Sequence, residues 1–142
     1  MFRLIAALTV LTLFAVPAAA DAKTLRGKTS QGRSITLTLG ADGVPTSVKF
    51  RWNLSCRKSK ATGHTASSFV RPFDQATPDV LADADSGSRR YRGGLRVRAT
   101  GSLSGQRSGE TWSGTLSFQR EFFRNGKKFD TCKAENVSWS VS

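Results

Sequence analysis

The chain has 142 residues, of which 22 are Lys or Arg and 10 are Asp or Glu, so its formal net charge at pH 7 is +12. This length suits one domain with a substantial hydrophobic core and argues against a second domain. A surface this basic attracts polyanions and repels cations. A competing explanation is codon bias, because arginine outnumbers lysine and alanine and glycine are plentiful, as in exported proteins of bacteria with G+C-rich genomes.

The first twenty residues have the pattern of a secretory signal peptide. One arginine precedes 13 uncharged, mainly apolar residues, a run of signal-peptide length that is too short to cross a bilayer. Ala18 and Ala20 are the small residues that a signal peptidase reads, so we expect cleavage before Asp21, with cleavage after Ala22 as the alternative. The mature protein is then secreted, or held in the periplasm or cell envelope, without an integral membrane segment.

Residues 21–142 form the predicted secreted domain and keep 21 Lys and Arg against 10 acidic residues, a net charge of +11. Cys56 and Cys132 are its only cysteines. An exported chain passes through an oxidising compartment, so these two residues predict one disulfide. The spacing typical of structural zinc sites is missing, and we expect neither a metal nor another cofactor.

The first half of the domain alternates between apolar and polar residues, which is typical of strands with one buried and one solvated face. Ile35, Leu37 and Leu39 alternate with threonines. The longest alternation covers 44–57. Its predicted core side holds Val44, Thr46, Val48, Phe50, Trp52, Leu54 and Cys56, and its wet side holds Pro45, Ser47, Lys49, Arg51, Asn53, Ser55 and Arg57.

The segment 72–88 breaks this pattern and collects four of the ten acidic residues. Thr77, Pro78 and Asp79 supply a capping hydroxyl, a proline suited to the first helical turn and a carboxylate near the positive helix end. We therefore predict a short helix over about 78–84, in a long loop between two strands.

Alternation returns in the second half, where three apolar faces recur, in 95–103, in 112–118 and at Val137, Trp139 and Val141. Cys132 has the opposite parity to the last of these faces. Either a bulge within 133–136 resets the pleat or the cysteine leaves the core face.

Turn signals separate the predicted strands, and Asn125-Gly126 is the clearest hairpin turn. The others lie in Ser30–Arg33, Gly40–Gly43 and Gly105–Gly109. Short strands with turns between them predict an all-β fold, a single antiparallel β-sandwich or small barrel of about 7–8 strands with one short helix.

No catalytic constellation stands out in the sequence. His64 is the only histidine and the only candidate base for a serine or cysteine triad, but no nucleophile elbow accompanies it. The acidic residues show no spacing that selects a catalytic pair. An enzyme is not predicted, and no residue is assigned a catalytic role.

Basic residues on wet strand faces are the strongest functional signal. They are Lys49, Arg51, Arg57, Lys58, Lys60, Arg96 and Arg98. If the strands of Lys49 and Arg96 are neighbours, their cations form one patch for phosphates or sulfates. We therefore expect a monomer that binds an anionic polymer without reading its sequence, such as a wall polymer, acidic polysaccharide or extracellular DNA.

Two other functions stay open at this point. The 74–92 loop, flanked by Phe69, Phe73 and Tyr91, would cover a pocket that binds or hydrolyses a small molecule or glycan. The aromatics would equally suit a hydrophobic plug under a long loop. The domain would alternatively act as a structural or protein-binding adhesive module.

Overall fold

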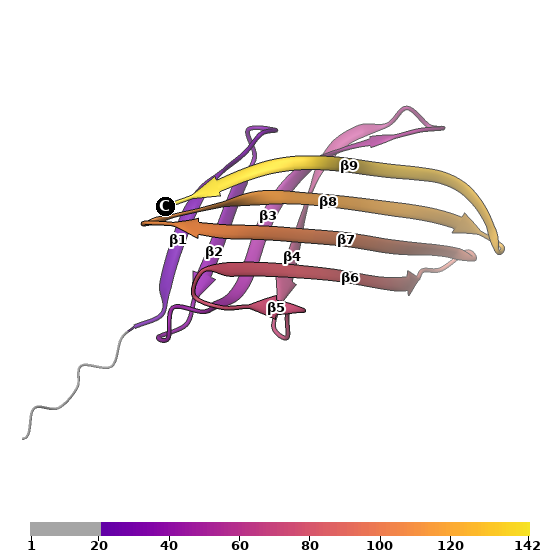
Figure 1. The fold of residues 1–142 in the computed structure, drawn as a ribbon. Coiled ribbons are helices and arrows are strands. Elements are labelled where there is room, and N and C mark those ends of the chain that lie inside the picture. The colour runs from indigo at the N-terminus through magenta and orange to yellow at the C-terminus, as the bar shows by residue number, and fades with distance from the viewer. Residues whose placement is uncertain (1–20) are drawn as a thin grey trace, which may run out of the picture.

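The computed structural model describes residues 21–142, so the predicted signal peptide lies outside the described residues. This part of the chain is all-β, with nine strands and no helix (Figure 1). The strands are β1 Lys23–Thr29, β2 Ser34–Leu39, β3 Pro45–Cys56, β4 Thr62–Val70, β5 Gln75–Ala76, β6 Val80–Arg90, β7 Leu95–Ser108, β8 Thr111–Arg124 and β9 Lys127–Val141.

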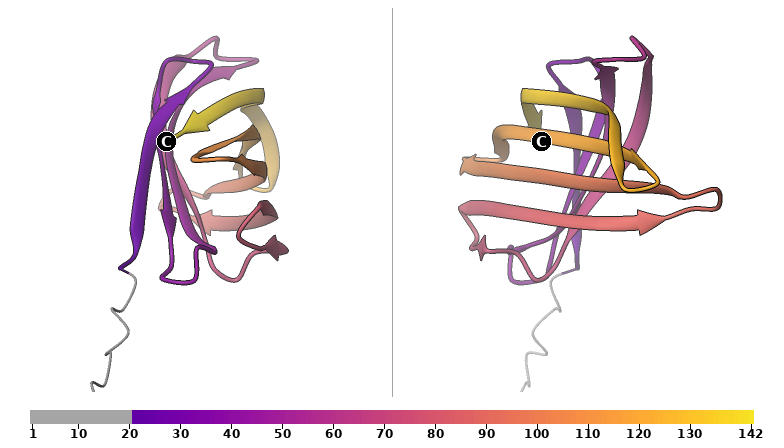
Figure 2. Two further views of the ribbon diagram at one scale, coloured as in Figure 1. Left: turned by 60° about the vertical axis from the view of Figure 1, so that its left-hand side comes forward. Right: turned by 90° about the vertical axis from the view of Figure 1, so that its right-hand side faces the viewer.

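All nine strands belong to one antiparallel sheet with the order β4-β3-β2-β1-β9-β8-β7-β6-β5. The sheet folds over on itself, so that β1–β4 form one layer and β5–β9 run across them in a second layer (Figures 1 and 2). β1 pairs with β9 where the layers join, and the end of β3 also pairs with β9, at Cys56 and Cys132. β4 and β5 are the two edges of the sheet.

The core lies between the layers and follows the predicted alternation from Val48 onward. Pro45, predicted on the wet side, is instead buried, where the register of β2 against β3 shifts. Phe50 and Trp52 are buried, whereas Lys49 and Arg51, on the same strand, are exposed. The ring of Trp52 lies 5.0 Å from that of Phe118 on β8, centroid to centroid, which joins the two layers through aromatic contacts. The strands form because each presents one apolar face that only the opposite layer covers.

The predicted disulfide between Cys56 and Cys132 is present. Of the two alternatives for Cys132, the bulge is the one found. Leu116 pairs with Val137 while Phe118 pairs with Ala134, so β9 has one extra residue here and its pleat is reset. Asn136, in this bulge, has φ of 51°, a left-handed conformation that asparagine tolerates. The bulge returns Cys132 to the buried face.

The predicted helix over 78–84 is wrong, because these residues belong to the turn before β6 and to β6 itself. The Thr77 hydroxyl does accept hydrogen bonds, from the backbone N–H groups of Asp79 and Val80, but it closes a turn rather than a helix. β6 pairs with β7 along its whole length and buries Leu81. The hydrogen bonds of this ladder stabilise the segment more than a single helical turn would, because the first turn of a helix is costly to nucleate.

The strand count is also higher than the predicted 7–8, because much of the expected 74–92 loop is β5 and β6. Residues 21–142 contain no helix that is long and apolar enough to cross a membrane.

Candidate functional site

The β6–β7 and β8–β9 hairpins project beyond the strands of the first layer (Figure 1). The hairpin turns lie together, because the backbone N–H of Asn125 donates to the carbonyl of Gly94. Asn125 and Gly126 have φ of 50° and 80°, as the predicted Asn-Gly hairpin turn requires. Beside the base of these hairpins, the β3–β4 turn is held to β9 by the hydrogen bond from Arg57 N–H to the Thr131 carbonyl.

Nearly all of the net charge gathers at this end of the molecule, which we call the basic end and define as residues 57–60, 87–100 and 119–131. These segments hold twelve Lys and Arg against two Asp and Glu, a net charge of +10. The other described residues hold nine against eight, a net charge of +1. The domain is therefore strongly polarised rather than uniformly basic.

The outer face of the basic end carries a row of cations on three strands, with Phe123 of β8 between them. Arg90 pairs with Arg96, Arg96 with Phe123, and Phe123 with Lys128. The Arg96 guanidinium lies 4.5 Å from the centre of the Phe123 ring, a cation–π contact that leaves its N–H groups available to a ligand. Lys128 is paired with Glu121 at 3.0 Å.

The inner face of the basic end continues the core side of β7 and β8 past the point where the first layer covers it. A groove of about 520 Å³ opens here, lined by Leu95, Val97 and Phe122 together with Arg89 and Arg120. The three apolar side chains are only partly buried. Two of the three large apolar side chains most exposed in the described chain border this region, Tyr91 at 48% and Phe129 at 38%.

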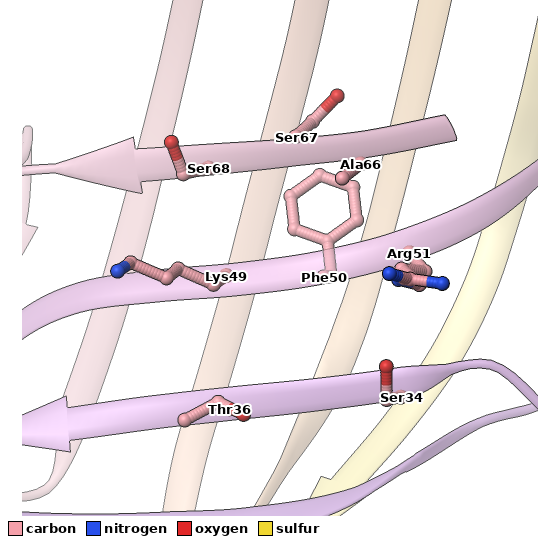
Figure 3. A pocket seen from close by; sticks show the side chains of 8 residues that line it. All are labelled: Ser34, Thr36, Lys49, Phe50, Arg51, Ala66, Ser67 and Ser68. Carbon is pink, nitrogen blue, oxygen red and sulfur yellow. The ribbon is translucent and has the colours of Figure 1, made fainter.

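The structure separates the seven predicted site residues into two groups. Lys49 and Arg51 lie on the outer face of the first layer, in a shallow hollow of about 340 Å³ (Figure 3). Figure 3 shows the small side chains beside them on β2 and β4, which are Ser34, Thr36, Ala66 and Ser68, together with Ser67, whose hydroxyl accepts a hydrogen bond from the buried Trp52. Arg96 and Arg98 lie on β7, which is not a neighbour of β3. The single patch of these four cations, expected from adjacent strands, therefore does not form.

Arg57, Lys58 and Lys60 are exposed in the β3–β4 turn and belong to the basic end. Arg57 and Lys58 line a hollow of about 400 Å³ with Lys128 and Phe129. Five of the seven predicted residues thus lie at one end of the molecule, and two lie apart from it.

Asp130 fixes this turn against the hairpin. Its buried carboxylate accepts hydrogen bonds from the backbone N–H groups of Lys58 at 2.9 Å and Ser59 at 3.1 Å, and from its own neighbour Thr131. The Ser59 side chain, then the Lys58 N–H, hold the pKa of Asp130 well below its usual range, although burial opposes them. Asp130 is therefore a structural anion and not a free acid.

The oxygen atoms of Asp130 lie near the sulfur atoms of Cys56 and Cys132. These sulfurs are bonded to each other, so they offer no thiolate to a metal. His64 is exposed on β4 opposite Asn53, and no hydrogen bond within 21–142 links it to a serine or a carboxylate.

Sequence reasoning missed the groove residues Arg89, Arg120 and Phe122 and the neighbouring Phe129, although one signal was available. The stretch QREFFRNGKKFD places three aromatics and four cations on either side of a clear hairpin turn. Comparison of the chain with protein-family models, curated proteins and solved structures finds no match.

Proposed function

We propose that this is an exported, non-enzymatic domain that binds an anionic polymer through the outer face of its basic end. The observation that carries the proposal is the charge distribution, with +10 of the +11 of residues 21–142 in three segments that meet at one end. A polymer with regularly spaced phosphates or sulfates is the ligand that matches such a row of cations.

The arginines of this end are free to bind. The ion pairs of the described chain are Lys23–Glu110, Lys128–Glu121 and Lys133–Glu135, and none of them uses an arginine. Arginine offers a planar fork of donors that suits phosphate and sulfate oxygens. Uncompensated, exposed guanidinium groups gain a partner on binding without losing one inside the protein.

Binding of this kind rests on counterion release and carries no sequence preference. Phe123 does not change that expectation, because its ring is already covered by Arg96. The proposed ligands are therefore wall polymers, acidic polysaccharides or extracellular DNA, distinguished by their charge density alone.

The test compares two double variants that remove the same charge from outer strand faces. Arg96→Gln with Arg98→Gln alters the basic end, and Lys49→Gln with Arg51→Gln alters the hollow on the first layer. With duplex DNA as a calibrated polyanion, each phosphate contact adds about 0.9 to the slope of log affinity against log salt. We expect the first pair to lower the slope by about 1.8 and the second to change it little.

The same proteins run on a heparin column provide a second polymer and an independent readout. Equal losses in both double variants would mean that the whole surface, and not the basic end, provides the attraction. A wild-type slope near zero would remove polymer binding altogether.

A further inference from the structure

The groove on the inner face of the basic end is not needed for polymer binding on the outer face. Its floor is a continuation of the core, because Leu103 is buried between the layers while Ala99, Val97 and Leu95 follow at every second position of β7. These last three residues are only half-buried, as is Phe122 opposite Val97 on β8. An apolar sheet face of this kind is normally covered.

Charged groups border this apolar floor. The Arg89 guanidinium lies 5.6 Å from the centre of the Tyr91 ring, and the Arg120 guanidinium lies 5.7 Å from that of Trp52. Neither arginine has an ion-pair partner among the described residues. The groove therefore combines an exposed cation, Arg89, and a half-buried one, Arg120, with an uncovered apolar surface. Its volume of about 520 Å³ falls in the range of small-molecule sites.

Charge decides what occupies it. A second copy of the chain in a symmetric contact would bring its own +10 end toward the first, and the two would repel. A neutral lipid would leave both arginines unpaired beside it. A ligand with one anionic group and an apolar body satisfies the arginines and covers the floor together.

We propose that the groove between β6, β7 and β8 binds a small anionic amphiphile, with its carboxylate, sulfonate or phosphate against Arg89 and Arg120 and its aliphatic or aromatic body on Val97, Leu95 and Phe122. The ligand is a free molecule with a single anionic head on an apolar body, and a lipid layer is the other source of that chemistry, which the test must distinguish. This site is separate from the outer face on which the polymer is proposed to bind.

Gly87 provides a way to close the groove without disturbing the protein. It lies on β6 beside Ala99, at the groove wall. A Cβ built there meets no atom within 4 Å, and its backbone is not left-handed. Gly87→Leu therefore projects into the empty groove. Ala84→Leu is the matched control, because residue 84 is exposed on the same strand with the opposite parity.

The experiment uses the mature protein and two probes, anilinonaphthalene sulfonate by fluorescence and dodecanoate by calorimetry, with the uncharged glycerol monoester of dodecanoic acid as the neutral counterpart. We expect wild type and Ala84→Leu to bind both anions, and Gly87→Leu to bind each about ten-fold more weakly. Arg89→Gln with Arg120→Gln should also weaken binding of the anions about ten-fold, and leave the neutral ester unchanged.

Several results would overturn the groove. They are equal binding to Gly87→Leu and wild type, equal binding of dodecanoate and its neutral counterpart, or binding to phosphatidylglycerol vesicles without any binding of free dodecanoate. Thermal melts of each variant identify a probe signal that comes from unfolding. Because Gly87→Leu leaves every cation in place, its salt-dependent binding to duplex DNA should equal that of wild type. The two proposals therefore fail independently.

Discussion

Removing the Cys56–Cys132 disulfide should cost a large share of the domain's stability. The bridge joins positions 76 residues apart, and in the chain-entropy account closing such a loop restricts the unfolded chain by about 4.5 kcal/mol at 25 °C. A domain of the 122 described residues has a typical free energy of unfolding of about 6–18 kcal/mol. The pairing of β3 with β9 persists without the bridge, so the double variant Cys56→Ala, Cys132→Ala should still fold.

Urea denaturation of the double variant measures this effect. We expect a loss of about 3–4.5 kcal/mol and a larger dependence on urea, since the uncrosslinked chain exposes more surface when it unfolds. Wild type kept in reductant should agree with the variant to within about 1 kcal/mol, because both lack the crosslink. A loss below about 1 kcal/mol in both samples would refute the entropic reasoning.

Three further predictions concern acid, tryptophan and salt. Because the fold lowers the pKa of Asp130, the unfolded state binds more protons in acid, so the free energy of unfolding measured in urea should fall as the pH drops below about 4. Asp130→Asn should flatten that decline, and the same decline in the variant would contradict the prediction. Trp52 and Trp112 are both fully buried, but of the two only the Trp52 indole donates a hydrogen bond. Trp52→Phe should therefore lower the free energy of unfolding by about 1 kcal/mol more than Trp112→Phe, and equal losses of stability would argue against this reasoning. Like charges at the basic end repel, so the melting temperature should rise with moderate salt, less so in the Arg96→Gln, Arg98→Gln variant; a fall in both would count against that repulsion.

The strands could be predicted from the sequence because alternation is a local property. In 44–57 the alternating residues show which side of β3 is buried, and Phe50 and Trp52 lie in the core as expected. Alternation gives no information on which strands are neighbours. The strand order of the sheet, in which β1 is the neighbour of β9, depends on long-range contacts. Whether the cations of β3 and β7 lie together could therefore not be predicted.

β6 was missed for a different reason. Its inward positions are Leu81, Asp83, Asp85, Gly87 and Arg89, so only the first has an apolar side chain. The strand lies near the edge of the sheet, where it pairs with β7 on one side and with only the two residues of β5 on the other. Most of its inner face is not covered, and an uncovered face has no reason to be apolar. The helix-start pattern at Thr77 was therefore the stronger local signal, and the cross-strand ladder outweighs it.

The groove could not be predicted, because at the basic end a residue on the core side of its strand is not necessarily buried. Arg120 and Phe122 have the same parity as Phe118 on β8 and so continue its core side. Parity alone would place all three in the core. The first layer ends before it reaches Phe122, and that limit is set by the lengths of strands far away in the sequence. A position whose parity continues the core side therefore faces an open groove in the structure.

The distribution of charge also bears on its origin. The basic end contains about a quarter of the described residues, so a compositional bias acting evenly would place about five of the 21 cations there, together with two or three of the ten acids. It holds twelve cations, while the acids stand at the two that chance alone predicts. Codon bias explains a preference for arginine over lysine, but it does not depend on which segments are close in the folded protein. It therefore does not explain why the cations concentrate in 57–60, 87–100 and 119–131. Like charges brought together in this way destabilise the fold that holds them. An arrangement with that cost is expected where the cations serve an anionic ligand, which is the reason to test the basic end before any other surface of the molecule.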